Sequence, residues 1–277
     1  MKALAVMSPQ GSGEAVRPCG ETQVAVIDLP LPDDFESLAV TRQTHTVEAA
    51  DGSVLTYHVL QGPGDGGEVL IRPYGAYGLN PDVFLARPIE QQWVAQGNTL
   101  VVPHLRGDAG GLEWIDAGQG DYKRTAATDL IAVTRDILAA RPQIDRVSLL
   151  GFSAGGFVSA RAALNQPELF EHVVLISSVS DLGLSEARHD GSFDQTEFGP
   201  ATGGFEAWLG GRPAGKSSPD FILLHGTSDS VVPASASASF AAYARRLGYE
   251  VKGQLYQGVG HDLANASYIL RDVEELW

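Results

Sequence analysis

The chain has 277 residues and a formal net charge of −15 at pH 7, a length that favours one large domain with a sizeable core. Its 19 Lys and Arg against 34 Asp and Glu argue against nucleic acid or an anionic membrane as partner, because both require clustered basic side chains. Cys19 is the only cysteine, so an internal disulfide is excluded and a catalytic or metal-binding cysteine is not expected.

The sequence shows no membrane-spanning pattern. Residues 1–15, MKALAVMSPQGSGEA, hold one lysine and an apolar run of about five residues, which is too short for the apolar region of a secretion signal. No later stretch approaches the 18 or so apolar residues that cross a bilayer. We therefore expect a soluble, cytoplasmic protein.

The first 40 residues are rich in Pro and Gly and predict an extended N-terminal arm, 1–40, with little core of its own. The folded domain is expected over 41–277. It opens with two strand-like runs, 41–49 and 54–60, followed by a third over 68–73. We interpret the glycine-rich segment 62–67, which precedes the third strand, as a hairpin loop.

Helical and apolar strand-like segments alternate in the rest of the domain. Helices are predicted over 82–97, 122–140, 154–165, 234–247 and 264–276. Further strands are predicted over 99–103, 147–150, 172–177, 221–225 and 251–256. Short apolar strands joined by helices predict an α/β fold, an eight-stranded, mostly parallel sheet with helices on both faces.

Residues 178–219 depart from this alternation, because they are rich in Gly, Ser, Asp and aromatic residues and lie between the sixth and seventh predicted strands. A long irregular connection in a compact domain is usually functional. We interpret it as a lid-like insertion that contributes the following aromatic residues to a pocket: Phe193, Phe198, Phe205 and Trp208.

The stretch GFSAGG places Ser153 directly between a predicted buried strand and a predicted helix. This is the setting of a nucleophile elbow, a sharp turn that exposes a serine hydroxyl. Gly151 and Gly155 flank the serine because such a turn leaves no room for Cβ atoms. The helix that follows directs backbone N–H groups towards a developing oxyanion.

A nucleophilic serine needs a base and an acid that orients the base. Asp229 and His261 each follow a later predicted strand, and the chain order Ser, Asp, His is that of the α/β-hydrolase fold. Asp181, after the sixth strand, is a rival acid, whereas Asp262 adjoins the histidine and is poorly placed to turn back to it. We interpret the remaining histidines as packed or solvated side chains: His45, His58, His104, His172, His189 and His225.

Nucleotide and metal motifs give no positive signal. Gly62, Gly64 and Gly67 match G-x-G-x-x-G but lead into a strand, so no helix N-terminus would face a pyrophosphate. The sequence contains no HExxH, paired CxxC or Walker pattern. We expect no cofactor and no metal, and we interpret the RGD tripeptide at 106–108 as a chance match.

Several stretches together resemble the catalytic domain of the prolyl oligopeptidase family of serine peptidases, from about residue 41 to the end. They are PYGAYG (73–78), LRGDAGGLEWIDAGQGDYK (105–123) with Asp129 beyond it, GFSAGG, HGTSDSVVP and GVGHD. The resemblance implies a catalytic triad of Ser153, Asp229 and His261.

The resemblance also implies an oxyanion hole formed by the Tyr74 hydroxyl and the Ala154 N–H. Tyr77 would lie near the pocket for the acyl-side residue. Arg106, Trp114 and Asp129 match framework positions, to which we assign no chemistry.

The chain departs from the family in three respects. It has no room for the β-propeller domain, it has Ser230 where prolyl-specific members follow DD with arginine, and it has Ala154 where they have asparagine. We expect a serine hydrolase that cleaves a peptide or peptide-like amide, with a small peptide or an acyl small molecule as its substrate. The alternatives are an esterase, lactonase or acyltransferase and, in another class, a non-catalytic binding protein on a hydrolase frame.

Overall fold

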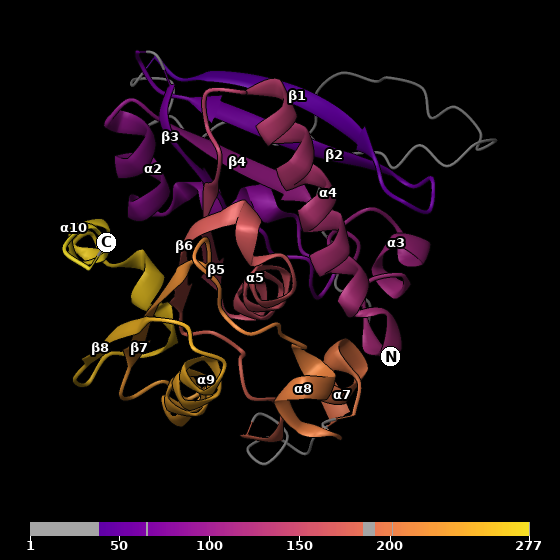
Figure 1. Ribbon diagram of the computed structural model, residues 1–277, viewed down its shortest axis with the longest axis vertical. Helices are drawn as coiled ribbons and strands as arrows, with labels where there is room; N and C mark the ends of the chain where they lie inside the picture. Colours follow the sequence, from indigo (N-terminus) through magenta and orange to yellow (C-terminus); the bar gives the residue numbers. More distant parts are fainter. Residues whose placement is uncertain (1–38, 65, 185–191, 201, 277) are drawn as a thin grey trace, which may run out of the picture.

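Eight strands form one sheet in the order β1-β2-β4-β3-β5-β6-β7-β8. The computed structural model describes residues 39–64, 66–184, 192–200 and 202–276 (Figure 1). The strands are β1 (Thr41–Glu48), β2 (Val54–Gln61), β3 (Gly66–Ile71), β4 (Asn98–His104), β5 (Val147–Phe152), β6 (Phe170–Ile176), β7 (Asp220–Gly226) and β8 (Val251–Tyr256). The predicted eight-stranded sheet is therefore confirmed.

Most of the sheet is parallel, as its sequence pattern predicts. Only β1 with β2 and β2 with β4 pair in antiparallel fashion, and all the other neighbours are parallel. The central parallel strands read as continuous apolar runs because helices cover both of their faces. Their carboxyl ends meet at one edge of the sheet, where open α/β sheets build their sites.

The interpretation of residues 62–67 as a hairpin loop is wrong. Strand β4 lies between β2 and β3, and β3 pairs in parallel with β4 and β5. Gly62 is required by close packing, because a Cβ atom there would lie 1.9 Å from the carbonyl oxygen of Val94. Turn composition marks where a strand ends, but it does not determine which strands pair.

Each of the five predicted helical segments contains an observed helix, in most cases with shorter ends, and the structure adds helices over Leu112–Asp116, Ser192–Phe198 and Gly204–Trp208 that were not predicted. The helices are α2 (Pro88–Ala95), α3 (Leu112–Asp116), α4 (Arg124–Ala140), α5 (Ala154–Asn165), α7 (Ser192–Phe198), α8 (Gly204–Trp208), α9 (Ser235–Arg246) and α10 (Ile269–Glu274). Short 3₁₀ helices are η1 (Pro81–Ala86), η2 (Gly120–Tyr122), η3 (Pro167–Leu169) and η4 (His261–Asn265). The predicted helix over 82–97 is split at Arg87, because the residue before a proline is driven to the extended conformation observed there.

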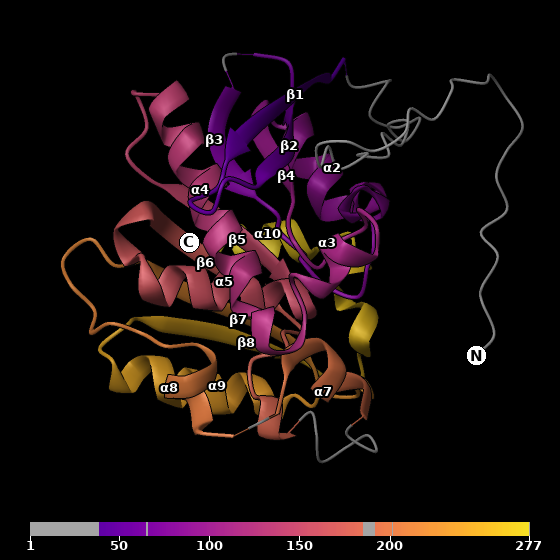
Figure 2. The ribbon, with the colours of Figure 1, turned by 90° about the vertical axis from the view of Figure 1, so that its right-hand side faces the viewer.

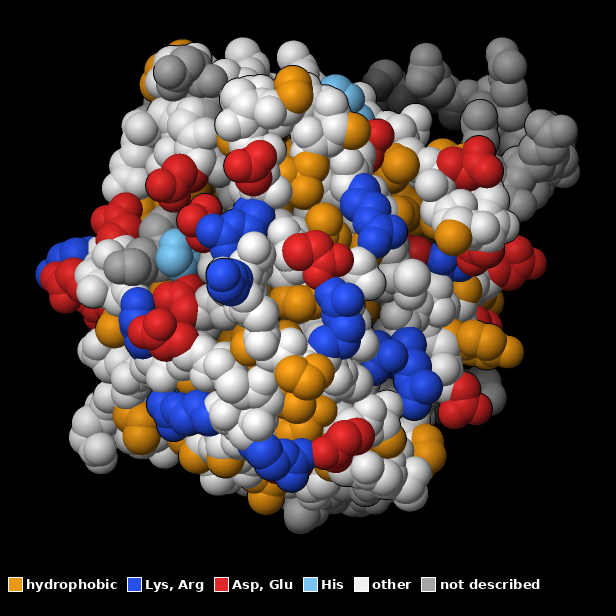
Figure 3. All heavy atoms as spheres, in the orientation of Figure 1, with side chains coloured by type: hydrophobic (Ala, Val, Ile, Leu, Met, Phe, Trp, Pro, Cys, Tyr) orange, Lys and Arg blue, Asp and Glu red, His pale blue; other side chains and the backbone are white. Residues whose placement is uncertain are grey.

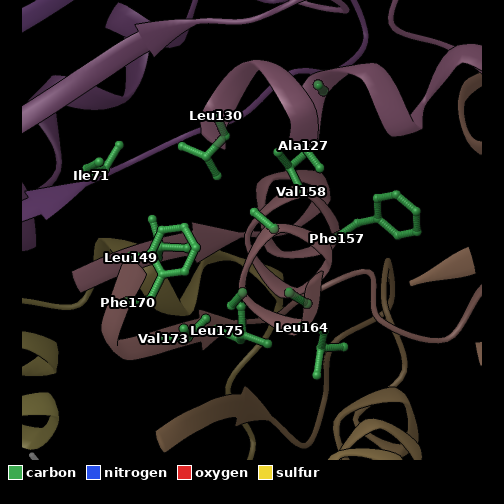
Figure 4. Packing of buried hydrophobic residues seen from close by; sticks show 14 of the residues in the cluster. Ile71, Ala127, Leu130, Leu149, Phe157, Val158, Leu164, Phe170, Val173 and Leu175 are labelled. Carbon is green, nitrogen blue, oxygen red and sulfur yellow. The ribbon is translucent and has the colours of Figure 1, made fainter. Parts of the chain in front are cut away.

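Two layers of helices enclose the sheet (Figures 1 and 2). One core packs α4, α5 and α9 against one face, and the other packs α2 and α10 against the opposite face. Figure 4 shows the centre of the first core, where Leu149 of β5 and Leu175 of β6 lie under Val158 of α5. This packing fixes the relation of β5 to α5, and with it the turn that carries Ser153.

Two predicted segments are only partly covered by the described residues. The predicted arm, 1–40, lies outside them except for its last two residues, and the predicted insertion, 178–219, includes α7 and α8. Both domain assignments therefore stay predictions. Among the described residues, no helix is long and apolar enough to cross a membrane. Figure 3 shows Lys and Arg side chains interspersed with Asp and Glu side chains across one face.

Candidate active site

Ser153 occupies the sharp turn between β5 and α5. Its φ of 50° and ψ of −121° are strained for a residue with a side chain, and such strain is concentrated at functional sites. The end of β6 holds the turn in place, since the Ser153 N–H donates to the Ile176 carbonyl at 3.1 Å and the Val179 N–H donates to the Ser153 carbonyl at 2.9 Å. The hydroxyl-bearing residue is thus fixed by backbone contacts on both sides.

The two flanking glycines are required by space. A Cβ atom at Gly151 would lie 2.7 Å from the Cα of Gly156, and one at Gly155 would lie 2.4 Å from the Pro73 carbonyl oxygen. The first contact lets α5 approach β5, and the second brings the loop after β3 against the start of α5. The glycines predicted to be obligatory are therefore in close backbone contacts.

Ser153, His261 and Asp229 lie together and form a continuous chain of hydrogen bonds. The Nε2 atom of His261 is 3.1 Å from the Ser153 Oγ, and its Nδ1 is 2.8 Å from Oδ2 of Asp229. The rival acid Asp181 instead accepts the backbone N–H of Leu184 at 3.3 Å. With Nδ1–H donating to the carboxylate, Nε2 is left to accept the serine proton.

Asp229 is held as an ion. Although burial alone would raise the pKa of its carboxyl group, hydrogen bonds from His225, His261 and the Val232 N–H together lower that pKa well below its usual range. Its Oδ1 accepts the N–H groups of Val231 at 2.9 Å and Val232 at 2.8 Å. The acid can therefore orient the imidazole throughout the neutral range.

His225 is a second histidine on this acid, and sequence reasoning missed it. Its Nε2 lies 3.3 Å from Asp229 Oδ2, and its Nδ1 is 2.7 Å from the Ser237 Oγ on α9. The available signal was its position four residues before the acid, at the end of the same strand. His225 therefore contributes to holding the carboxylate that faces His261.

The pKa of Asp229 predicts an acid-side loss of stability. Its folded-state pKa is below the unfolded value of about 4. Below about pH 4 the unfolded chain therefore binds more protons than the folded chain, and the free energy of unfolding decreases as the pH is lowered. Urea unfolding of wild type and Asp229→Asn, from pH 7 down to pH 3, should show the stability difference between them shrinking below about pH 4. A difference that is constant with pH would contradict this assignment.

The loop that carries Tyr74 lies beside the start of α5, where Ala154 is found. The Tyr74 Cα is 3.3 Å from the Cβ position that Gly155 would have, next to the start of α5. Ala154 is the first residue of that helix, so its N–H has no partner within the helix. Burial raises the pKa of Tyr74 above its ordinary value, and its hydroxyl therefore stays protonated and able to donate.

Asp108 fixes the backbone of the loop that carries Tyr74. Its Oδ1 accepts the N–H groups of Gly75 at 2.7 Å and Ala76 at 3.3 Å, and its Oδ2 accepts that of Leu105 at 3.0 Å. The carboxylate is fully buried. Asp108, the aspartate of the RGD tripeptide, thus organises this loop, and no sequence spacing indicated its backbone partners.

A buried ion pair ties the same loop to the predicted insertion. Lys123 Nζ donates to the Gly75 carbonyl and to Oε1 of Glu197, both at 2.5 Å. The other carboxylate oxygen of Glu197, which lies on α7, accepts the Tyr77 N–H at 3.0 Å. Both charged side chains are almost completely buried. Sequence reasoning missed this pair because its partners are 74 residues apart.

Removing the lysine should destabilise the fold strongly. In Lys123→Met the carboxylate of Glu197 loses its counter-ion while buried, a change that typically costs about 3–5 kcal/mol. Urea unfolding at pH 7 measures the loss. The matched variant Lys216→Met alters an exposed lysine and should leave the midpoint nearly unchanged; equal midpoints for both variants would contradict the account.

Tyr77 lies beside the predicted insertion. Its ring centroid is 6.1 Å from that of Phe198, which in turn is 5.2 Å from Phe157. Phe157, Phe198 and Trp208 also line a hollow of about 190 Å³. Phe205 does not line this hollow, although its ring lies 5.5 Å from that of Trp208, and it stacks on Tyr243 of α9 at 4.8 Å.

The side chain of Phe193, the remaining predicted pocket aromatic, lies outside the described side chains. The framework positions are as expected. Arg106 donates to Asp129 through Nε at 2.9 Å, and the Trp114 indole donates to the Leu105 carbonyl at 2.9 Å.

One group of described residues has the composition of a metal site. His58, Asp82 and His104 are buried, and their possible ligand atoms lie within 4.8 Å of one another. Arg42 already donates to Oδ2 of Asp82 at 2.8 Å, so a cation is present beside the carboxylate. We assign this group a structural role, anchoring η1 to β2 and β4.

A mostly parallel, helix-covered sheet with a strained serine at the end of a central strand defines the α/β-hydrolase class. Within that class, the family model described as "Prolyl oligopeptidase family" matches residues 86–277, which is more than half of the chain. The chain therefore belongs to the prolyl oligopeptidase family, and this membership supports its being a serine hydrolase.

The curated relatives that match over the longest stretches are named as peptidases, and the chain covers about a quarter of the length of each. The chain is 25% identical over 171 residues to an uncharacterised peptidase of Rickettsia prowazekii, covering 60% of this chain and 24% of that protein. It is 31% identical over 166 residues to an uncharacterised peptidase of Sinorhizobium fredii, covering 57% and 24%. A shorter match, 51% over 43 residues, covers 16% of this chain and 9% of a "probable isoprenylcysteine alpha-carbonyl methylesterase" of Arabidopsis thaliana.

Solved structures share the fold at low identity. A prolyl endopeptidase is similar with a TM-score of 0.73 and 21% identity over 90% of this chain and 38% of that one. A post-proline cleaving enzyme from Rickettsia typhi gives 0.73 and 19% over 84% and 37%. Oligopeptidase B from Trypanosoma brucei gives 0.68 and 20% over 84% and 36%. The chain spans well under half of each.

Proposed function

We propose that the protein cleaves a peptide or peptide-like amide through an acyl-enzyme on Ser153. The observation that carries this proposal is the unbroken chain of hydrogen bonds from Asp229 through His261 to the Ser153 hydroxyl. A serine hydroxyl becomes a useful nucleophile only when a base takes its proton and an acid stabilises the charged base. These requirements are met by side chains from three separate loops.

In each step of the proposed mechanism a proton transfer accompanies the formation or breaking of one covalent bond. His261 Nε2 takes the proton from Ser153 Oγ as the oxygen attacks the substrate carbonyl, and the Tyr74 hydroxyl and the Ala154 N–H stabilise the oxyanion. The imidazolium gives its proton to the leaving nitrogen, the C–N bond breaks, and the acyl group stays on the serine. Water then attacks the ester while His261 takes its proton, and His261 returns that proton to the Ser153 Oγ as the ester C–O bond breaks and the acid product leaves.

The relatives and the pocket support a peptide substrate. The curated relatives that match at length are named as peptidases, and Tyr77 with Phe198 offers an aromatic surface for an acyl-side residue. Specificity for proline is not part of the proposal, because Ser230 stands at the position of the family's peptide-binding arginine. A small peptide or small acyl compound is the proposed partner, with no nucleic acid or membrane.

Ester hydrolysis is the second candidate. The short match to a protein named as a methylesterase favours it, and the same catalytic groups would serve an esterase, a lactonase or an acyltransferase. A non-catalytic role on this frame is the weakest candidate, because it leaves three mutually oriented catalytic groups without use.

Matched substrates discriminate between these functions. A set of N-acyl aminoacyl methyl esters and the corresponding amides, varied in the acyl residue, should show turnover of both classes that is abolished in Ser153→Ala. Fast ester cleavage with amide turnover no higher than the uncatalysed rate would replace the peptidase proposal with the esterase. No turnover of either class by a folded protein would favour the non-catalytic role.

A further inference from the structure

A single aromatic side chain, Phe152, separates Arg87 from the candidate catalytic group His261. Its Cζ atom is 3.9 Å from the ring centroid of Phe152 and 4.3 Å from that of Phe84. Phe152, which precedes the nucleophile, has its ring centroid 5.1 Å from that of His261, and Phe84 lies 4.7 Å from Tyr74. The guanidinium is therefore clamped between two aromatic rings, each in contact with a member of the candidate active site.

Among the described residues the Arg87 guanidinium makes no ion pair or hydrogen bond at contact distance, and the Glu90 carboxylate attracts it only from farther away. Its neighbour Arg72 differs, because Nε of Arg72 lies 3.4 Å from Oε1 of Glu90 and its Nη2 donates to the Pro81 carbonyl at 2.8 Å. Glu90 is the acidic residue of the helix that begins just after Arg87, and it is already engaged by Arg72.

Burial makes an unpaired guanidinium costly. It lowers the pKa of Arg87 to about 10, so the side chain is still a cation at neutral pH. The faces of two aromatic rings recover part of the lost hydration, but they leave the in-plane N–H donors available. A planar fork of donors beside an active site matches a carboxylate, which it can bind through two parallel hydrogen bonds.

The location of Arg87 determines which part of a substrate it can meet. The acyl-side aromatic surface, Tyr77 and Phe198, lies on the side of the predicted insertion. Arg87 instead contacts Phe152, whose ring adjoins the imidazole that would protonate the leaving nitrogen. The guanidinium is therefore on the leaving-group side.

We propose that Arg87 binds the free carboxylate of the leaving group, so that the preferred substrates are short peptides that release a C-terminal amino acid or dipeptide. One residue of a leaving group spans about 3.8 Å, and a hydrogen bond from arginine to its carboxylate adds about 2.8 Å. Leaving groups of one or two residues therefore match the separation of the Arg87 guanidinium from the His261 imidazole, between which the Phe152 ring lies. This inference rests on the proposed function and specifies its substrate class.

The test compares peptides that differ only at the C-terminus. Acetyl-Ala-X-Ala and acetyl-Ala-X-Ala-Ala, with X as Ala, Leu, Phe or Pro, are supplied as free acids and as carboxamides, and cleavage after X is followed by mass spectrometry. Wild type should prefer the free acids by about 10- to 100-fold in kcat/KM, the range expected for hydrogen bonds to a charged group. Arg87→Gln should abolish this preference, and Arg87→Lys should retain part of it.

Binding to Ser153→Ala, measured by calorimetry, separates this inference from the proposed function. A preference for free acids in that variant, lost in Ser153→Ala with Arg87→Gln, supports the carboxylate site even if no peptide is turned over. Arg135→Gln removes an exposed positive charge and should keep the preference, which excludes an effect of net charge.

Either of two results would overturn the inference. The first is equal use and equal binding of acids and carboxamides by wild type. The second is a preference unchanged in Arg87→Gln while its melting temperature falls, which would make the aromatic clamp a purely structural contact.

Discussion

Ser153→Ala should lower kcat/KM for the best matched substrate by about 10⁴-fold or more, while leaving the fold intact. The loss is expected to be large because in the proposed mechanism the serine, the histidine and the aspartate act as one unit, and the remaining oxyanion donors would give only residual catalysis. Alanine fits the turn sterically, since it removes one oxygen and keeps the same Cβ atom. Steady-state kinetics and circular dichroism of both proteins measure the two parts of the expectation.

The control for this variant is Ser267→Ala, which changes an exposed serine outside the candidate site and should retain wild-type rates. Substantial activity in folded Ser153→Ala would show that another group performs the chemistry. A comparable loss in Ser267→Ala would instead indicate general sensitivity of the protein to substitution.

Tyr74→Phe should reduce kcat by about 10²- to 10³-fold with little change in KM, the typical result of removing one oxyanion donor. The ring would still pack against Phe84 at 4.7 Å, so the change is confined to the hydroxyl. In the proposed mechanism that hydroxyl meets the charge that develops in the transition state, so its loss is expected to act on the chemical step rather than on ground-state binding.

Tyr122→Phe is the matched control, because Tyr122 is an exposed tyrosine, and it should behave as wild type. If Tyr74→Phe raises KM and leaves kcat unchanged, the hydroxyl binds substrate in the ground state and the assigned oxyanion role is wrong. If it changes neither constant, Tyr74 is a packed aromatic residue without a part in the chemistry.

Much of the fold and the grouping of the candidate site can be predicted from the sequence, for a physical reason. Parallel strands that are buried on both faces appear as apolar runs, and their carboxyl ends meet at one edge. Ser153 and Asp229 follow two such runs and His261 follows the more amphipathic edge strand β8, and the structure brings the three side chains into hydrogen-bond contact. The backbone strain at Ser153 follows from the same local signal, a serine between two glycines.

Contacts between distant segments escaped prediction. Asp108 binds backbone N–H groups more than 30 residues away, and Lys123 pairs with Glu197 across 74 residues. The sequence indicates neither contact, because it does not distinguish a charged side chain that will be buried from one that will be exposed to solvent. The placement of β4 between β2 and β3 escaped prediction for a related reason, since turn residues do not record strand order.

The central claim is that Ser153 is an activated nucleophile, and covalent labelling tests it most directly. A fluorophosphonate probe is applied to folded wild type and to Ser153→Ala, and the adduct is read by intact mass and peptide mapping. The account predicts a single adduct on Ser153 of the wild type and none on the variant. A folded wild type that remains unlabelled, or an adduct that persists in Ser153→Ala, would contradict it.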